Sequence, residues 1–138
     1  MSSPSRPATH LAIDPRLSGE AVELEPGRAT VRLEAGETLA ADERGLVHGG
    51  FLFSAADYCA MLAVNRANVV LAAAEMRFLA PVAVGEIVLA RGWAQATAEN
   101  RYRVEVEVSR REGKESVVVA RGVFDCVVTA RHVLERRE

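Results

Sequence analysis

One acidic residue lies inside the most apolar segment of this 138-residue chain. Asp57 stands in FSAADYCAML, where nearly every neighbour is apolar. Burying an isolated carboxylate is unfavourable, so such a group needs partners or a raised pKa. Acids in that state concentrate at functional sites, although many single buried Asp residues only bond nearby backbone or face a polar subunit interface. Asp57 is therefore a candidate for acid–base chemistry, with a structural role as the alternative.

A histidine and two glycines come just before this segment, as His48-Gly49-Gly50. Glycines let another backbone or a ligand approach closely. If a helix begins here, its free N–H groups and the positive end of its dipole suit a developing oxyanion. The alternative is an ordinary junction between a loop and a helix, with His48 capping it.

The helical repeat brings these two features to one side of the same helix. Four residues fall there at i, i+4, i+7 and i+11 spacing, namely Gly50, Ser54, Asp57 and Met61. The rise of an α-helix puts Asp57 about 10 Å from Gly50. Because this is far for one substrate atom, we expect a second copy of the chain to supply the other half of the site.

The hydrophobic pattern predicts one helix among antiparallel strands. A nearly all-apolar helix is expected over 48–68, and it must be wrapped on most sides. Alternation and turn residues predict strands over the ranges 28–35, 69–78, 86–97, 102–109 and 116–129. Short turns make neighbouring strands antiparallel, which predicts an α+β domain whose curved sheet wraps the helix. Pairing of exposed sheet edges predicts a dimer.

Composition sets the protein class. Apolar residues make up 49% and charged residues 26%, which is typical of a globular domain, and the net charge of −2 argues against nucleic-acid binding through a basic surface. No apolar run approaches the roughly 18 residues that span a membrane. We expect a flexible leader over 1–18, one domain over 19–130 and a charged tail over 131–138.

The remaining reactive residues indicate little chemistry of their own. Cys59 and Cys126 have no CxxC spacing, so neither a disulfide framework nor a zinc site is expected, and free buried thiols indicate a cytoplasmic protein. Three histidines, two of them near the termini, do not predict a metal site. The chain also lacks the GxSxG, Walker A and GxGxxG motifs.

Together the motifs resemble the hotdog-fold acyl-CoA thioesterases, in the PaaI-like branch named after a phenylacetate-pathway enzyme. The resemblance covers residues 20–129 and rests on HGG with an acid nine positions after the histidine, here His48 and Asp57. A later F-x-x-P-x-x-x-G-[DE] segment is matched by Phe78, Pro81, Gly85 and Glu86. It implies a five- or six-stranded antiparallel sheet around a central helix, a homodimer with two interface active sites, and often a dimer of dimers.

The resemblance also implies residue roles. Asp57 would be the general base or nucleophile, the Gly49 N–H would polarise the thioester carbonyl, and His48 would help hold the site. The other residues expected to contact substrate are Gly50, Ser54, Asp42 and Arg77, the last through the phosphates of coenzyme A, although a solvated strand face is the alternative for Arg77. No metal or organic cofactor is implied, since coenzyme A belongs to the substrate.

Two departures keep other activities open. Asp42 stands where relatives often have Asn or Gln, and residues 69–75 carry no hydroxyl where some have Ser or Thr. One alternative is a non-catalytic acyl-CoA binder, acting as a sensor or partner protein. Hotdog repressors that bind malonyl-CoA carry an amide where this chain keeps an acid. A hydratase or dehydratase would need a second suitable histidine, which we do not find.

Overall fold

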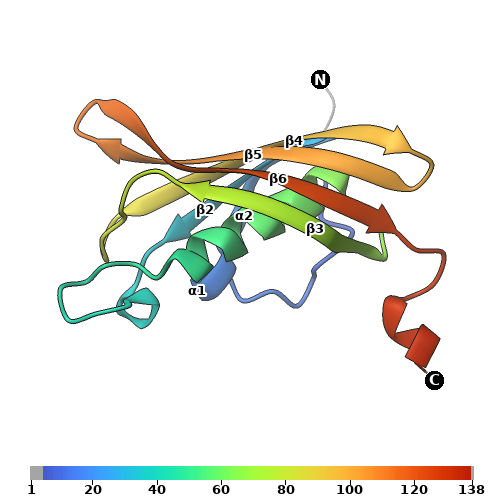
Figure 1. Ribbon diagram of the computed structural model, residues 1–138, viewed down its shortest axis with the longest axis horizontal. Coiled ribbons are helices and arrows are strands. Elements are labelled where there is room, and N and C mark those ends of the chain that lie inside the picture. The colour runs from blue at the N-terminus through green and yellow to red at the C-terminus, as the bar shows by residue number, and fades with distance from the viewer. Residues whose placement is uncertain (1–4, 138) are drawn as a thin grey trace.

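The computed structural model describes residues 5–137, which form a curved antiparallel sheet around a central helix (Figure 1). The strands lie in the order β1-β2-β4-β5-β6-β3, so β1 and β3 are the sheet edges. Their bounds are β1 Glu20–Glu25, β2 Arg28–Glu34, β3 Val69–Phe78, β4 Ile87–Ala98, β5 Arg101–Glu112 and β6 Glu115–Val128. The helices are α1 Pro15–Ser18, α2 Gly49–Val64 and the 3-10 turns η1 Glu37–Leu39 and η2 Val133–Arg137. The hotdog fold and the α+β class expected from the sequence are confirmed.

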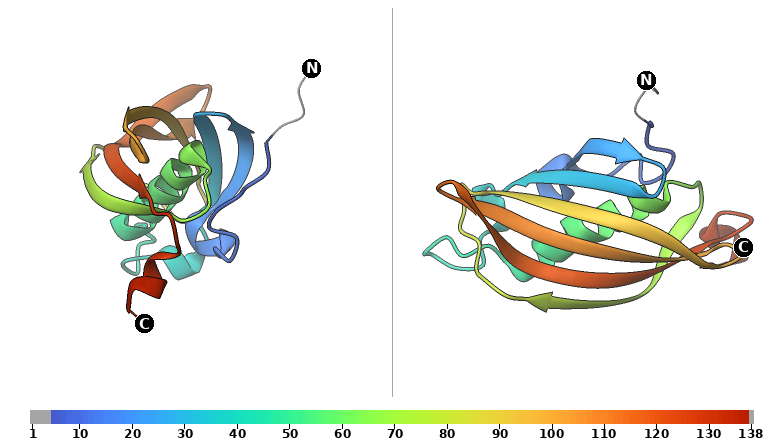
Figure 2. Two further views of the ribbon diagram at one scale, coloured as in Figure 1. Left: turned by 90° about the vertical axis from the view of Figure 1, so that its right-hand side faces the viewer. Right: turned by 90° about the horizontal axis from the view of Figure 1, so that it is seen from above.

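Helix α2 lies in the hollow of the sheet, as the end-on view shows (Figure 2). Small residues let it come close to the strands: the Cys59 sulfur is 3.4 and 3.3 Å from the carbonyl oxygens of Ala29 and Ala90. A Cβ at Gly92 of β4 would lie 3.0 Å from that sulfur. The apolar sequence of α2 is thus explained by contact with the sheet on most sides.

The predicted elements agree closely with those in the structure. In β2, Ala29, Val31 and Leu33 are buried as the alternation predicts, but Thr30, expected on the solvent-facing side, is buried as well. Helix α2 ends earlier than the predicted 68, because Asn65 takes the left-handed conformation that closes a helix. Strand β5 extends beyond the predicted 102–109 at both ends.

Strand β1 and the short helix α1, which lie before β2, were not predicted, nor were the two 3-10 turns. Strand β1 pairs with β2 along the sheet edge. Residues 5–18, which we call the N-terminal strap, pack against the domain instead of extending from it as a leader. Asp14 caps α1 through its side chain, and Ser18 at the end of α1 is buried. Residues 1–4 of the expected leader lie outside the described residues.

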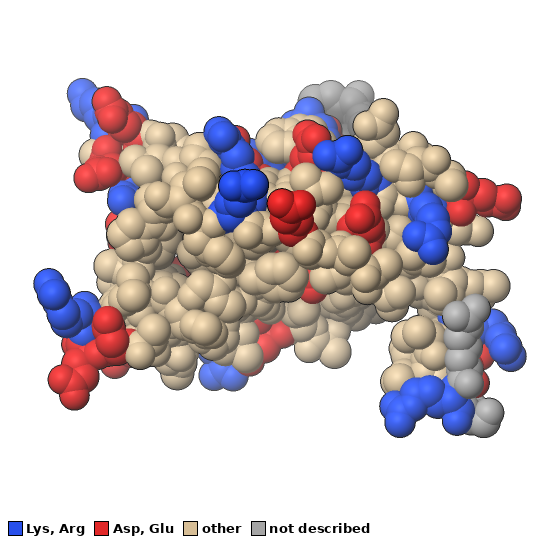
Figure 3. Space-filling view, viewed as in Figure 1, with Lys and Arg blue, Asp and Glu red and all other residues tan. Residues whose placement is uncertain are grey.

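The edge strand β3 presents a surface suited to another copy. Ala72, Ala73 and Ala74 are exposed along it, and the surface below β3 carries few charged side chains (Figure 3). An exposed edge strand is a template for pairing with a second strand, and these three small, uncharged residues leave room for one, although Glu75 and Arg77 are exposed further along β3. Dimerisation through this edge stays a prediction. Within residues 5–137, no helix has the length and apolar character needed to cross a membrane.

Candidate functional site

Asp57 is held halfway along α2 with no partner for one of its oxygens. The side chain is half-buried, and its Oδ1 is buried without a hydrogen bond to any described residue. Burial alone raises the pKa of this carboxyl to about 6. Asp57 also contributes, after burial, to raising the pKa of the Cys126 thiol on β6 to about 12. An unpaired acid that titrates near neutral pH is suited to accepting a proton during a reaction.

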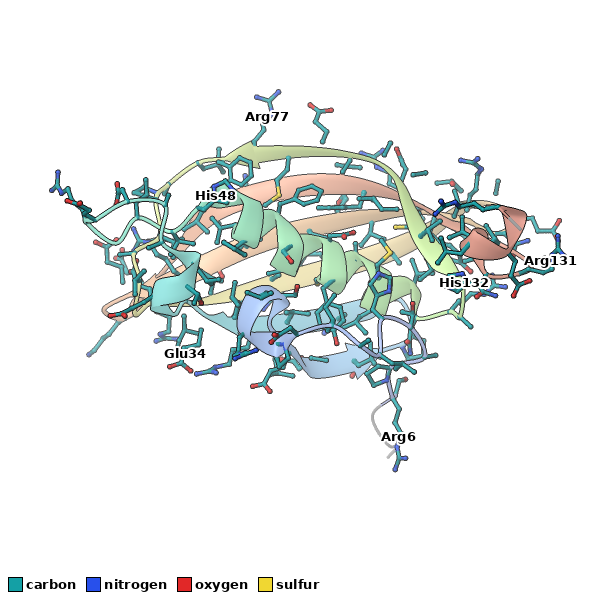
Figure 4. The ribbon with its side chains drawn as sticks, turned by 90° about the horizontal axis from the view of Figure 1, so that it is seen from below. Arg6, Glu34, His48, Arg77, Arg131 and His132 are labelled. Atoms are coloured by element: carbon teal, nitrogen blue, oxygen red, sulfur yellow. The ribbon has the colours of Figure 1, made fainter. Side chains whose placement is uncertain are left out.

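The position of Asp57 around the helix explains its partial burial. Ala56 and Ala63 are fully buried toward the sheet, whereas Phe53, Asp57 and Val64, which lie further round the helix, are half-buried. Seen from below, β3 runs along one side of α2 and the N-terminal strap along the other (Figure 4). Asp57 therefore lies where the side of α2 that packs on the sheet, through Phe53 against β6, meets the side that the sheet leaves open.

The start of α2 supplies hydrogen-bond donors, as the sequence predicted. His48 is the N-cap but makes no capping bond with its side chain. Its ring packs edge-on against Phe51, 5.8 Å away, and a Cβ at Gly50 would lie 2.7 Å from its Nε2. A side chain at position 50 would clash with the His48 imidazole, so glycine there allows the ring to take this position. The first N–H groups of a helix, here those of Gly49 and Gly50, have no acceptor within it.

Asp57 and the N–H groups at the start of α2 do not meet within one copy. Asp57 follows Gly50 by seven residues on one helix, which is about 10 Å along its axis. A thioester carbon and its carbonyl oxygen are bonded neighbours, so one chain alone does not place the acid and these donors on the same substrate group.

Two residues expected to contact substrate are engaged by other parts of the chain. Ser54 is half-buried, and its Oγ lies 2.6 Å from the Oγ of Ser18. Asp42 is exposed, and its Oδ1 accepts hydrogen bonds from the N–H groups of Arg44 and Leu46 at 3.0 and 3.1 Å. Asp42 therefore shapes the loop before α2 and does not share the burial of Asp57.

Arg77 lies on the outer side of the sheet. It pairs across the strands with Arg121 and lines an outer hollow of about 430 Å³ with Trp93 and Glu107. Figure 4 shows its side chain pointing away from α2. Within one copy, then, Arg77 and Asp57 are not brought together.

Sequence reasoning missed the strap residues that border this side of α2. The half-buried ring of His10 lies 6.5 Å from that of Tyr58, the residue after Asp57. The Asp14-Pro15 pair is a helix-start signal that identifies α1. Nothing local in the sequence indicates the contact of His10 with α2. Among the described residues, no group of His, Cys, Asp and Glu side chains is arranged to hold a metal ion.

Comparison with known proteins places the chain in a family. The profile of the Thioesterase superfamily matches residues 44–117, more than half of the chain. The structure of the uncharacterized protein PH1136 from Pyrococcus horikoshii is 41% identical with a TM-score of 0.88, covering 96% of this chain and 99% of that one. A mutant of the phenylacetic acid degradation protein PaaI from Thermus thermophilus is 31% identical with a TM-score of 0.71, covering 82% and 95%.

Two further likenesses are more limited. The chain is 47% identical over 106 residues to the methylthioribose-1-phosphate isomerase of Aquifex aeolicus, which is 77% of this chain but only 23% of that relative's length. A protein from Streptococcus mutans, bound to acetyl-CoA, shares the fold at 22% identity and a TM-score of 0.71, covering 82% of this chain and 90% of its own. The superfamily profile, the likeness to PaaI and the hotdog fold agree: the chain belongs to the thioesterase superfamily and is a PaaI-like member of it.

Proposed function

We propose that the chain hydrolyses a small or medium acyl-CoA, or an aryl-CoA, to the free acid and coenzyme A. The observation that carries this is Asp57, whose buried Oδ1 lacks a partner among the described residues and whose pKa is raised to about 6. At neutral pH such a carboxyl is mostly ionised yet still a competent base. Membership in the thioesterase superfamily and the acetyl-CoA bound to a protein of the same fold support the thioester as substrate.

In this proposal each active site is shared by two copies. Pairing of β3 with β3 of a second copy would cover the exposed alanines and set the two α2 helices side by side. The Gly49 N–H of one copy would then face Asp57 of the other. The second copy would thus bring together two groups that are about 10 Å apart within one helix. Two such dimers could join as a tetramer.

The reaction follows from these two groups. Asp57 accepts a proton from water while the water oxygen attacks the thioester carbon. The carbonyl oxygen becomes negative and is stabilised by the N–H of Gly49 at the helix N-terminus. The carbon–sulfur bond then breaks, the acid is released, and the proton returns from Asp57 to the thiolate of coenzyme A. Direct attack by the Asp57 carboxylate, followed by hydrolysis of the anhydride, gives the same products.

The other residues have supporting roles in the proposal. His48 lies over Gly50 at the helix start and helps to hold the thioester. Ser54 acts mainly through its bond to Ser18. Arg77 would reach coenzyme A only if a second copy or a dimer of dimers brings its outer face to the site. The proposed reaction needs no metal or organic cofactor.

Release of free thiol from a panel of acyl-CoAs tests the proposal. The panel holds acetyl, malonyl, hexanoyl, benzoyl and phenylacetyl thioesters. We expect wild type to hydrolyse at least one and Asp57→Asn to lose about a hundredfold or more in kcat/KM. Asp125→Asn, which removes an exposed carboxylate from β6, is the matched control and should keep full activity.

The same panel separates hydrolysis from binding alone. If no thioester is cleaved but an acyl-CoA raises the Tm, the chain is an acyl-CoA-binding protein and the hydrolase proposal is wrong. The absence of a hydroxyl in residues 69–75 of β3 would then be the first feature to examine.

Ala73→Lys on β3 tests the shared site. A charge at the centre of the pairing edge should convert dimers to monomers, as measured by light scattering, and activity should fall with the dimer. A monomer that keeps full activity would contradict the shared site.

A further inference from the structure

The N-terminal strap is fastened to α2 at both of its ends. At one end, the Ser18 and Ser54 hydroxyl oxygens are 2.6 Å apart, and Ser18 is only 5% exposed. At the other end, the Asn65 side chain donates to the Arg6 carbonyl at 2.9 Å and accepts from the Ala8 N–H at 2.7 Å. Two hydrogen bonds from one amide hold the backbone of the strap in register with the end of the helix.

Between these ends the strap presses a histidine against α2. His10 takes φ +54°, a conformation that is uncommon for a residue with a side chain and needs local support. Its Nδ1 lies 2.8 Å from the hydroxyl of Thr9, which is 7% exposed. The ring is half-buried beside Tyr58, whereas the next strap residue, Leu11, is 78% exposed. The strap therefore aims His10 inward and Leu11 outward.

The helical repeat puts this contact next to the candidate site. Ser54, Tyr58 and Asn65, which meet the strap, follow one another along one row of α2. Asp57 lies in the adjacent row, between the strap and β3. The open side of α2 thus has two borders. The strap is one of them, and β3, where the second copy is proposed to pair, is the other.

The packing of α2 beneath the strap is closed at two large side chains. Met61 and Leu62 of α2 are completely buried. An acyl chain that extends from Asp57 toward the strap would therefore lie outside this packing, against the strap itself. The strap also lies outside the residues 44–117 that match the superfamily profile.

We propose that the N-terminal strap limits the size of the acyl group and that His10 is the residue that sets the limit. This inference rests on the proposed thioesterase function and deepens it. The substrate class it names is the thioester of a compact acyl group, a short aliphatic chain or a single aromatic ring. A longer chain has to displace the His10 ring, and with it the bonds that fasten the strap.

Replacing His10 by glycine tests this limit with little change to the backbone. Glycine adopts φ +54° without strain, so His10→Gly removes the ring and leaves the strap conformation accessible. Leu11→Gly is the matched control, because it places a glycine in the same segment but removes an exposed side chain. Asn65→Gly, which keeps the left-handed conformation but loses both clasping hydrogen bonds, tests the fastening.

The readout is the ratio of kcat/KM for decanoyl-CoA to that for hexanoyl-CoA. We expect His10→Gly to raise this ratio about tenfold or more, the effect of accommodating one or two further methylenes, and Asn65→Gly to raise it in the same direction. Leu11→Gly should leave it unchanged. A ratio that stays at the wild-type value in His10→Gly overturns the inference, even where Asp57→Asn shows that hydrolysis itself is as proposed.

The ratio of dissociation constants for the two thioesters, measured with Asp57 replaced by Asn, gives the same test without turnover. A shift toward decanoyl-CoA in His10→Gly supports the inference even if wild type hydrolyses nothing, in which case only the proposed reaction fails. An unchanged ratio of dissociation constants contradicts the size limit. Far-UV circular dichroism of each variant shows whether the fold is retained.

Discussion

The pH dependence of stability is the sharpest physical consequence of the buried Asp57 carboxyl. Its pKa rises from 3.8 to about 6 on folding, so the folded protein binds more protons than the unfolded chain between about pH 4 and pH 6. The free energy of unfolding must then fall as the pH rises through this window and level off above it. The Asp57→Asn variant escapes this loss, because an amide side chain cannot ionise.

The magnitude follows from the shift. About two pKa units correspond to an upper bound of about 3 kcal/mol, at 1.36 kcal/mol for each unit. Because the side chain is only half-buried, screening by solvent lowers the expected value to about 1–2 kcal/mol. The free energy of unfolding of Asp57→Asn minus that of wild type should therefore increase by about 1–2 kcal/mol from about pH 4 to about pH 7.5. If the buried amide of the Asp57→Asn variant, without a partner, lowers stability, it does so equally at both pH values, so this cost does not affect the increase.

Urea denaturation of both proteins across this pH range measures the effect, at one protein concentration so that association contributes equally. Asp125→Asn removes an exposed carboxylate of β6 and serves as control, for which a much smaller pH-dependent change is expected. The reasoning is refuted if the stability difference between Asp57→Asn and wild type is the same at both ends of the range. It is also refuted if wild type gains stability relative to the variant as the pH rises.

Two further predictions concern the rate and the strap. The kcat/KM of wild type should rise with pH and reach a plateau above about 6, because Asp57 must be ionised to act; a rate that falls over this range would contradict its role as base. Gly19→Ala should lower the free energy of unfolding by about 2–4 kcal/mol, because Gly19 has φ +84° and a Cβ there would lie 2.6 Å from Val31 Cγ1 and 2.7 Å from the Arg32 carbonyl oxygen. Thermal unfolding checks this second prediction, with the exposed Gly36→Ala as control, and an unchanged Tm would show that the end of α1 is not held against β2.

Most of the strands were predictable from the sequence because each one shows its own pattern of alternating apolar residues. In the centre of β5, Val104, Val106 and Val108 face the core and the residues between them are more exposed, and this period of two is visible without any long-range contact. Strand β1 was missed for the same reason. Along β1 only Leu24 is buried, so the strand has no alternating face, and its place depends on pairing with β2.

The candidate site was predictable in its chemistry but not in its surroundings. An acid in an apolar helix identified Asp57, and the HGG motif identified the start of that helix. The contact of His10 with Tyr58 joins residues 48 positions apart, and the bonds of Asn65 to the strap reach 57 and 59 positions along the chain. No local pattern encodes contacts of this kind. The outward direction of Arg77 is likewise fixed by the pairing of β3 with β6, which the sequence does not show.

Mixing two inactive variants tests most directly whether Asp57 of one copy acts with the helix N-terminus of the other. One variant is Asp57→Asn. The second is Gly49→Pro, which removes the N–H at the first helical position, where proline is well tolerated; the extended backbone of His48 suits a following proline. Gly49→Ala, which keeps the N–H, is its control and should remain active.

Each mixed dimer would hold one intact site and one doubly altered site. With random pairing, the refolded equal mixture should regain about a quarter of wild-type acyl-CoA hydrolysis, although each variant alone is nearly inactive. If the mixture is no more active than the sum of the two separate variants, while light scattering shows that mixed dimers form, then Asp57 does not act with Gly49 of a second copy and the account of the site is contradicted.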